Sequence, residues 1–228
     1  MSVVVQGELP EALALRLGCK ESEVRRVLAA MHQRDASDLG APREQVSRNT
    51  RKHLSESARI GRLEILEQQE SKLDPFVKFA LRTEDGYVIE TVRIPLERPG
   101  RFSVCVSSQV GCAIGCRFCK TTQAGLHRNL AAWEIVEQVR IVRQSLPEGT
   151  RVSSVVFQGM GEPLANLDSV IQAVRVLSHP ACQSIESGNR SRFAPRGCHE
   201  ESVASTPRSF GSDSDSPWAV PLPNVAKR

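Results

Sequence analysis

The stretch FSVCVSSQVGCAIGCRFCK, residues 102–120, begins as an apolar strand and ends in a loop rich in cysteine. Four of the chain's seven cysteines lie within it. Residues 131–146 follow with apolar side chains at helical spacing, which predicts a helix. The order strand, loop, helix is the repeating unit of a parallel sheet or a (βα) barrel. The stretch therefore predicts an α/β fold.

A second unit follows the first. Residues 151–159 predict a strand, MGEP predicts its exit loop, and residues 166–177 predict a helix capped by Asn166. The expected inward face of this helix consists of Leu167, Val170, Ile171, Val174 and Leu177. Functional loops gather at the carboxyl ends of such strands, so both loops are expected at one edge. Two units form only a partial barrel, with an open edge at the second strand.

The residues before this core are expected to form helices. Residues 8–58 carry helical patterns, of which residues 22–34 begin at a capping-type serine, Ser22. Residues 41–62 hold six Lys or Arg against two Glu. This basic run is typical of a solvated helix face, and a patch that contacts nucleic-acid phosphates is the alternative.

A β-hairpin is predicted next. Residues 75–94 alternate with period two around an Asp-Gly turn. Alternation puts Glu90 on the same face as the apolar residues Val88, Val92 and Ile94. The carboxylate is either an inward charge that protects a sheet edge or a partly buried group suited to proton transfer. Spacing alone favours the edge-protecting charge.

The composition limits the classes of function. At 228 residues and 40% hydrophobic content the chain can bury a core without disulfides, and no apolar stretch is long enough for a membrane helix. A soluble cytoplasmic protein is expected, in which clustered cysteines bind metal or act in catalysis. The net charge of +4 permits an anionic partner such as RNA, and 4% aromatic residues argue against a base-stacking platform.

The last 42 residues, 187–228, hold eight Ser, five Pro and three Gly without apolar periodicity. This composition predicts a disordered or out-of-frame tail. The predicted organisation is therefore a helical accessory domain at 1–70, a hairpin region at 71–97, a partial barrel core at 98–186 and a tail at 187–228.

The cysteine loop carries metal-site chemistry. Cys112, Cys116 and Cys119 form C-x3-C-x2-C, and three thiolates can hold three irons of a cubane cluster, leaving the fourth iron open. A zinc site is the alternative and requires a fourth ligand such as Cys105 or His127. Buried inert cysteines are the remaining interpretation.

The loop GMGEP, residues 159–163, is the second candidate element. Its glycines let the backbone approach a ligand closely, and Glu162 offers a carboxylate to an ammonium group. A glycine-rich turn before a helix is the plain structural alternative.

These motifs resemble a known family. CVSSQVGCAIGCRFC (105–119), RNL (128–130) and GMGEPLAN (159–166) are similar to the RlmN/Cfr family of radical S-adenosylmethionine (SAM) RNA methyltransferases. The resemblance runs from about residue 90 to about residue 177. It implies a radical SAM barrel, with a [4Fe-4S] cluster on Cys112, Cys116 and Cys119. It also implies that SAM binds the open iron and contacts Gly161 and Glu162.

The resemblance implies a reaction as well. The family methylates an unreactive adenine carbon, and the pattern here is nearer the RlmN branch, which implies C2 of adenosine in 23S rRNA and, as a further substrate, tRNA. An electron donor such as flavodoxin is the implied partner. By motif, Cys105 matches the family's resolving cysteine and Glu90 its proton-accepting glutamate, which reverses the expectation that spacing alone gave for Glu90.

One family residue has no counterpart that the motifs identify. The methyl-carrying cysteine of the family follows the barrel, and neither Cys182 nor Cys198 has a matching neighbourhood. We therefore expect a truncated or frame-shifted member with impaired methyl transfer. The alternatives are a non-catalytic iron-sulfur or zinc-binding fragment and a radical SAM enzyme with another substrate.

The frame-shift hypothesis predicts a result at the level of DNA. Translation of the coding DNA in the other two frames should yield a barrel-like continuation, with alternating strand and helix patterns, after about residue 187. If neither frame contains such a pattern downstream, the hypothesis is wrong.

Overall fold

The N-terminal residues form three helices around an apolar core of their own. A computed structural model describes residues 2–34, 36–40, 42–182 and 185, so the predicted tail lies outside the described residues. The helices are α1 (Pro10–Leu17), α2 (Glu21–Arg34) and α3 (Arg48–Ser57), which confirms the helical prediction. Their core contains Val5, Leu13, Val24, Val27, Leu28, Met31 and Leu54. Two short strands, β1 (Val3–Val4) and β2 (Ala58–Arg59), pair in parallel beside it.

The helix starts differ in part from the expectation. Ser22 lies inside the first turn of α2, whose earliest backbone bonds run from Glu23 and Val24 to the carbonyl of Lys20. The N-cap position is therefore Lys20, and the predicted cap at Ser22 is wrong by two residues. A serine does cap α3, because the Ser47 side chain accepts a hydrogen bond from the backbone N–H of Thr50 at 3.2 Å.

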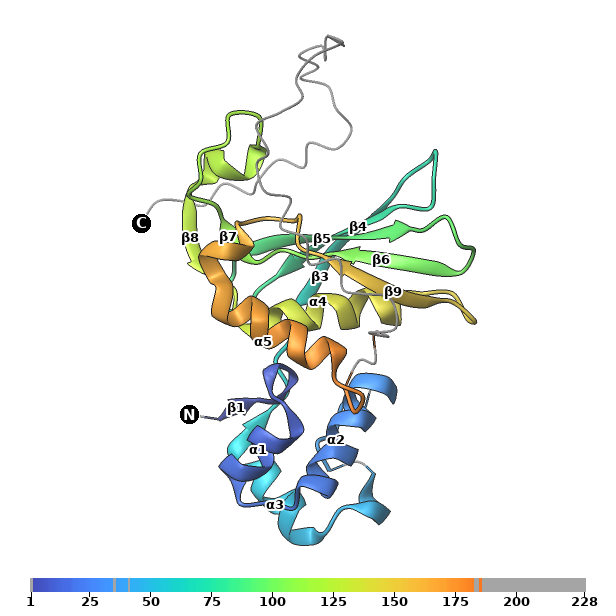
Figure 1. Ribbon diagram of the computed structural model, residues 1–228, viewed down its shortest axis with the longest axis vertical. Coiled ribbons are helices and arrows are strands. Elements are labelled where there is room, and N and C mark those ends of the chain that lie inside the picture. The colour runs from blue at the N-terminus through green and yellow to red at the C-terminus, as the bar shows by residue number, and fades with distance from the viewer. Residues whose placement is uncertain (1, 35, 41, 183–184, 186–228) are drawn as a thin grey trace. The chain divides into compact units, whose positions relative to one another are not determined.

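A mixed five-stranded sheet forms the centre of the fold (Figure 1). Its order is β3 (Glu64–Glu70), β4 (Val77–Arg82), β5 (Val88–Pro95), β6 (Arg101–Cys105) and β9 (Arg151–Val156). The first four strands pair antiparallel, and β6 pairs with β9 in parallel. The β4–β5 hairpin and the parallel pair were both predicted. Strand β3 was not, because its side chains are mostly exposed and give no alternating apolar pattern.

The strand predicted over residues 102–110 is broken in two. After β6 ends, residues 106–108 leave the strand pattern, and β7 (Gln109–Gly111) pairs instead with β8 (Leu126–Asn129). The break occurs because the backbone of Ser107 bonds to the side chain of Gln138 in both directions, at 2.8 and 3.1 Å. Strands β7 and β8 thus form a separate hairpin whose tip is the cysteine loop.

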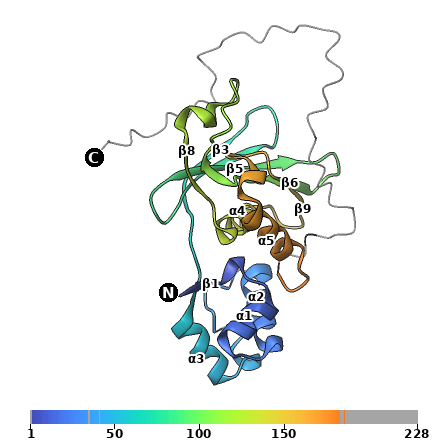
Figure 2. The same cartoon turned by 60° about the vertical axis from the view of Figure 1, so that its left-hand side comes forward.

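Two helices lie on one side of the sheet (Figures 1 and 2). They are α4 (Ala132–Gln144) and α5 (Leu167–Ser178). The buried side of α5 is formed by Val170, Ala173, Val176 and Leu177, whereas Leu167 is 44% and Ile171 is 38% exposed. The predicted inward face was therefore partly wrong, because the small residue Ala173 packs inward where the pattern favoured larger neighbours.

The first residues of the chain also bond to α4. The Gln6 side chain is fully buried and donates to the Glu137 carboxylate at 3.1 Å and to the Gly61 carbonyl at 2.6 Å. Glu137 in turn forms a two-bond ion pair with Arg140 at 2.8 Å. The buried carboxylate is thereby paired, as burial of a charge requires.

Among the described residues, no helix is long and apolar enough to cross a membrane.

Helix α2 carries a buried histidine, His32, near its C-terminal end. His32 is 0% exposed, and neither ring nitrogen has a hydrogen-bond partner among the described residues. Burial, together with the charges of Arg143 and Arg140, lowers the pKa of His32 to about 3 from its usual 6.5. The ring is therefore neutral in the folded chain, and the unfolded chain binds the proton first as the pH falls.

We predict that His32 makes the fold sensitive to acid. Its contribution is fully present above pH 6.5 and is lost progressively as the pH falls towards 3, and the loss amounts to about 2 kcal/mol at pH 5. In urea unfolding at pH 7.5 and pH 5, His32→Leu should lose about this much less stability than the unsubstituted chain. His127→Leu, at an exposed position, serves as the control and should behave as the unsubstituted chain does. Equal acid sensitivity of His32→Leu and the unsubstituted chain would contradict the prediction.

Candidate functional site

The cysteine segment and the GMGEP loop meet at the carboxyl ends of β6 and β9. The backbone N–H groups of Ser108 and Gln109 both donate to the carbonyl of Met160, at 2.8 and 3.2 Å. The N–H of Met160 donates back to the Ser107 hydroxyl at 2.9 Å. Two motifs about fifty residues apart are thus joined through backbone atoms, at the sheet edge where the sequence placed them.

The glycines of the GMGEP loop are required by this close approach. A Cβ atom at Gly159 would lie 2.7 Å from the backbone of Val106. Gly161 has φ +98°, and a Cβ there would lie 2.5 Å from the Cβ of Gln109. Only a residue without a side chain fits at either position. The packing of these glycines against Val106 and Gln109 agrees with the structural interpretation of the loop as a glycine-rich turn before a helix.

Glu162 lies directly after these glycines and caps the short 3-10 helix η4 (Pro163–Asn166). Its carboxylate accepts a hydrogen bond from the Leu164 N–H at 3.0 Å, and its own N–H donates to the Gln109 side chain at 2.8 Å. The residue is half-buried. Contacts within the chain therefore hold both the backbone and the carboxylate of Glu162 in place.

The cysteine loop is stabilised at its two ends. The N–H of Cys112 donates to the Gly125 carbonyl at 3.0 Å, and that of Cys119 donates to the Cys116 carbonyl at 3.0 Å. The Thr122 hydroxyl reaches the carbonyls of both Cys116 and Cys119. All three thiols are free; Cys112 is buried, and the other two are partly exposed.

The three thiols are suitable in kind for a metal cluster but are not gathered. Within the part of the chain that the structure describes, no three His, Cys, Asp or Glu side chains lie close enough together to hold a metal ion. The fourth zinc ligand considered above also finds no support, because Cys105 is buried at the end of β6 and His127 stacks on Tyr87 at 4.9 Å between ring centroids. Soft thiolates on one short loop nevertheless match the donor set of an iron-sulfur cluster.

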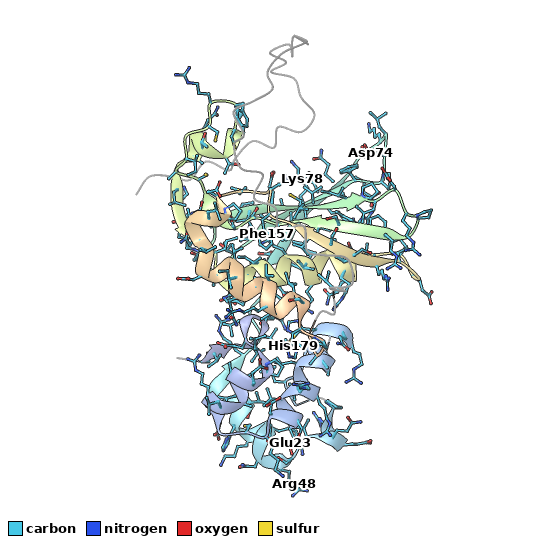
Figure 3. All side chains as sticks on the ribbon, viewed as in Figure 1. Glu23, Arg48, Asp74, Lys78, Phe157 and His179 are labelled. Atoms are coloured by element: carbon cyan, nitrogen blue, oxygen red, sulfur yellow. The ribbon has the colours of Figure 1, made fainter. Side chains whose placement is uncertain are left out.

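Glu90 and Cys105 lie on the same face of the sheet. Cys105 pairs with Val92 across β5 and β6, and Glu90 is two residues from Val92, so their side chains point to one side. Lys78 of β4, labelled in Figure 3, pairs with Val92 from the other side. Its ammonium group forms an ion pair with Glu90 at 3.1 Å. This is the side of the sheet that α4 and α5 do not cover.

Two expectations about Glu90 need correction. The buried side chains of β5 are Ile89 and Thr91, so Glu90 shares the more open face, and its side chain is 42% exposed. The strand lies between β4 and β6, so Glu90 cannot protect a sheet edge. Its partner at 3.1 Å is the Lys78 ammonium, whose side chain is only 14% exposed. Glu90 is therefore neither buried on an apolar face nor placed at a sheet edge.

The cysteines outside the C-x3-C-x2-C motif include two buried ones, Cys105 and Cys182. Burial raises the pKa of the Cys105 thiol, so the thiol is protonated at neutral pH. Cys182 is fully buried in the main core, and burial raises the pKa of its thiol to about 12. The Cys182 thiol is therefore protonated at neutral pH. Cys198 lies outside the described residues.

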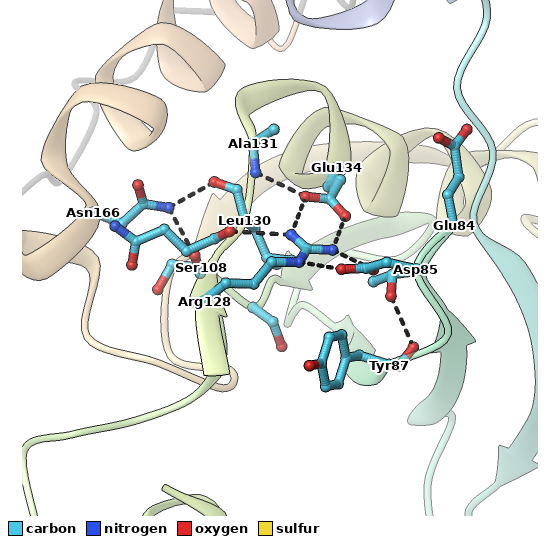
Figure 4. Close-up of polar contacts among 12 residues, drawn as sticks. Glu84, Asp85, Tyr87, Ser108, Arg128, Leu130, Ala131, Glu134 and Asn166 are labelled. Carbon is cyan, nitrogen blue, oxygen red and sulfur yellow. Dashed lines mark hydrogen bonds and ion pairs between the residues drawn. The ribbon is translucent and has the colours of Figure 1, made fainter. Parts of the chain in front are cut away.

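Sequence reasoning missed an arginine clamp beside the site (Figure 4). Arg128 of β8 donates two hydrogen bonds to Asp85, at 2.6 and 2.7 Å, and two to the buried Glu134 of α4, both at 2.8 Å. The hydrogen bonds from Arg128 lower the pKa of Asp85 to about 2. Because the turn of the β4–β5 hairpin is joined in this way to β8 and α4, the clamp fixes the base of the cysteine hairpin.

Asn166 has a role other than the predicted one. It occupies the N-cap position of α5, but its side chain forms no capping bond. Its amide instead donates to the carbonyls of Ser108 and Leu130, each at 2.8 Å. The residue therefore fastens the end of the GMGEP loop to both sides of the β7–β8 hairpin.

The basic run at 41–62 is partly neutralised. Arg59 forms a two-bond ion pair with Glu84 at 2.6 and 2.7 Å, Arg43 lies 3.6 Å from Asp38, and Lys52 lies 4.0 Å from Glu56. These contacts agree with a solvated face. Contact with nucleic-acid phosphates through this run stays a prediction.

Known proteins resemble the chain in sequence and in fold. No protein-family model matches it. A "probable RNA methyltransferase" of Sorangium cellulosum is 51% identical over 185 residues, which are 79% of this chain and 47% of that protein. A "dual-specificity RNA methyltransferase RlmN" of Halorhodospira halophila is 43% identical over 162 residues, 71% of this chain and 44% of that protein. The crystal structure of a radical SAM methyltransferase from Sphaerobacter thermophilus matches with TM-score 0.69 and 30% identity, over 80% of this chain and 54% of that one. The chain thus spans about half the length of these relatives.

The close packing of Gly161 leads to a prediction about stability. Gly161→Ala and Gly86→Ala both place a side chain at positive φ, +98° and +90°, but only the former meets another residue within 4 Å. Both should be destabilised by about 1–2 kcal/mol by the backbone conformation, and Gly161→Ala by about 1–3 kcal/mol more through overpacking against Gln109. Urea unfolding measures both free energies. Equal losses in the two variants would show that the loop does not pack on Gln109 as described.

Proposed function

Because the chain belongs to the RlmN/Cfr family of radical SAM RNA methyltransferases, we propose that it takes part in radical SAM methylation of RNA. The observation that carries the proposal is the joining of the cysteine segment to the GMGEP loop through Ser107, Ser108 and Met160. A site for a cluster and a site for its SAM ligand must lie side by side, and these hydrogen bonds hold the two loops together at one sheet edge.

The cofactors follow from the residue types. Cys112, Cys116 and Cys119 would hold a [4Fe-4S] cluster, and Gly161 and Glu162 would contact SAM, with the carboxylate facing its ammonium group. When bound, the cluster supplies the electron that cleaves SAM. The Gly159 and Gly161 backbones keep the loop flat against β6 and β7, and this positions Glu162.

The open face of the sheet would receive the base to be methylated. Glu90 would accept the proton from the adenine carbon, with Lys78 at 3.1 Å holding the carboxylate in place. Cys105, on the same face, would act as the resolving thiol, and its raised pKa keeps it protonated until that step. The substrate is proposed to be C2 of adenosine in 23S rRNA, with tRNA as a further substrate and a flavodoxin-type protein as electron donor.

Complete methyl transfer needs a second reactive cysteine. The fully buried Cys182, with a thiol pKa of about 12, does not fit that role. We therefore propose that the described residues supply cluster binding and SAM cleavage, and that methyl transfer by these residues alone is impaired. A non-catalytic iron-sulfur or zinc-binding module and a radical SAM enzyme with another substrate are the competing outcomes.

Anaerobic reconstitution with iron and sulfide tests the proposal. The unsubstituted chain should bind about four irons and show charge-transfer absorbance, and alanine at Cys112, Cys116 and Cys119 together should abolish both. Cys105→Ser is the matched control and should retain the iron, because Cys105 is proposed to be no ligand. Formation of 5′-deoxyadenosine from SAM under reduction should follow the iron content.

Each other outcome points to a different function. Stoichiometric zinc binding without cluster formation would overturn the proposal in favour of a structural site. A cluster that leaves SAM intact would identify a non-catalytic module. SAM cleavage without methylation of 23S rRNA, even when a full-length relative supplies its own methyl-carrying cysteine, would favour another substrate.

A further inference from the structure

The side chain of Gln109 is buried at the junction of the two loops and has no role in the function proposed above. The residue is 1% exposed and begins β7, between the end of β6 and the cysteine loop. A buried primary amide carries two donors and an acceptor, and each needs a partner to offset the loss of water. The partners of Gln109 therefore show which parts of the fold it holds.

Gln109 bonds to both loops at once. Its Oε1 atom accepts from the Glu162 N–H at 2.8 Å, and its Nε2 atom donates to Oδ1 of Asn129 at 2.7 Å. The Nδ2 atom of Asn129 donates onward to the Ala165 carbonyl at 3.3 Å. A chain of side-chain amides thus links Glu162 of the GMGEP loop, the cysteine hairpin and the 3-10 helix η4.

The direction of this chain is fixed from both ends. The Ala165 carbonyl can only accept, so it orients the Asn129 amide; the Glu162 N–H can only donate, so it orients the Gln109 amide. Both ends require the same orientation of the two amides. At position 109 a glutamate carboxylate would lack the donor that Asn129 needs, and leucine or methionine would lack both the donor and the amide oxygen. Glutamine satisfies both partners.

Gln109 also contacts the loop through its aliphatic part. Its Cβ and Cγ atoms occupy the space that a side chain at Gly161 would need, at 2.5 and 2.7 Å from the ideal Cβ position. Its backbone N–H donates to the Met160 carbonyl. Three successive residues of the loop, Met160, Gly161 and Glu162, therefore rest on one side chain and its backbone.

We propose that Gln109 is a positioning residue of the cofactor site, which sets the backbone of Glu162, and through it the carboxylate, relative to the cysteine hairpin. The part of the proposal that concerns SAM rests on the proposed function, because Glu162 is assigned to the ammonium group of SAM there. The part that concerns the loop itself stands on the described contacts. Gln109 touches neither the cluster ligands nor SAM in this role; it acts through Glu162.

Amide hydrogen exchange in the cofactor-free chain tests the contact. Gln109→Leu removes both hydrogen bonds at nearly constant volume, and the Glu162 amide should exchange roughly tenfold faster or more, as expected for the loss of a buried bond. Gln144→Leu, at an exposed position near the end of α4, is the control and should leave that rate unchanged. An unchanged rate in Gln109→Leu would overturn the proposal at its structural level.

A second variant guards against misfolding. Asn129 is exposed, so Asn129→Ala removes the far end of the amide chain without disturbing the core. The Glu162 amide should then exchange faster than in the unsubstituted chain and more slowly than in Gln109→Leu. If Gln109→Leu does not fold, this variant decides alone, and an unchanged rate in it overturns the proposal.

SAM binding by the reconstituted protein tests the role in the cofactor site. Gln109→Leu should bind SAM roughly tenfold more weakly while its iron content equals that of the unsubstituted chain, because no cluster ligand has changed. Equal SAM affinity in the two proteins would overturn the role of Gln109 and leave the proposed function intact. Failure of the unsubstituted chain to bind SAM would overturn the proposed function and this role together, whereas the exchange experiment would still report on the loop.

Discussion

The Met160 peptide lies where the two halves of the site are joined, and the arrangement of both depends on it. Its carbonyl accepts from Ser108 and Gln109, and its N–H donates to the Ser107 hydroxyl, which itself donates to the carbonyl of Glu90 at 2.6 Å. Backbone groups buried in this way cost free energy unless they are paired, so the loop cannot leave β6 without losing several bonds together. The Glu90 backbone, the cysteine hairpin and the GMGEP loop are thereby held by one junction.

The sequence predicted the elements with strong local signals. The Asp85-Gly86 turn, the parallel pair β6–β9 and the helices before residue 58 were recognised because turn chemistry and periodicity act over short distances. The loop motifs were recognised from cysteine and glycine spacing. The placement of both loops at one edge followed from strand order, and the structure places them there.

The remaining features depend on contacts between distant residues. The bonds of Arg128 to Asp85 span 43 positions, and the bond of Asn166 to Ser108 spans 58, so no local sequence pattern predicts them. The exposed face of β5 was mistaken for the inward one because Val88, Val92 and Ile94 are apolar, although the opposite face, with Ile89 and Thr91, is the one that packs under α4. Which face is buried depends on the partner element, and alternation alone does not supply that information.

The position of Asn166 has a consequence for the order of events during synthesis. Ser108, at the start of the cysteine hairpin, leaves the ribosome 58 residues before the asparagine that fastens it, and Leu130, at the end of the hairpin, leaves 36 residues before it. Until then the hairpin lacks that anchor and the Met160 bonds, and closing so long a loop is an entropic cost that only the completed junction offsets. In a nascent chain the base of the hairpin would therefore be held by the Arg128 clamp, without the Asn166 anchor, for as long as this interval of translation lasts. The junction between the two loops is therefore completed only after the second βα unit has emerged.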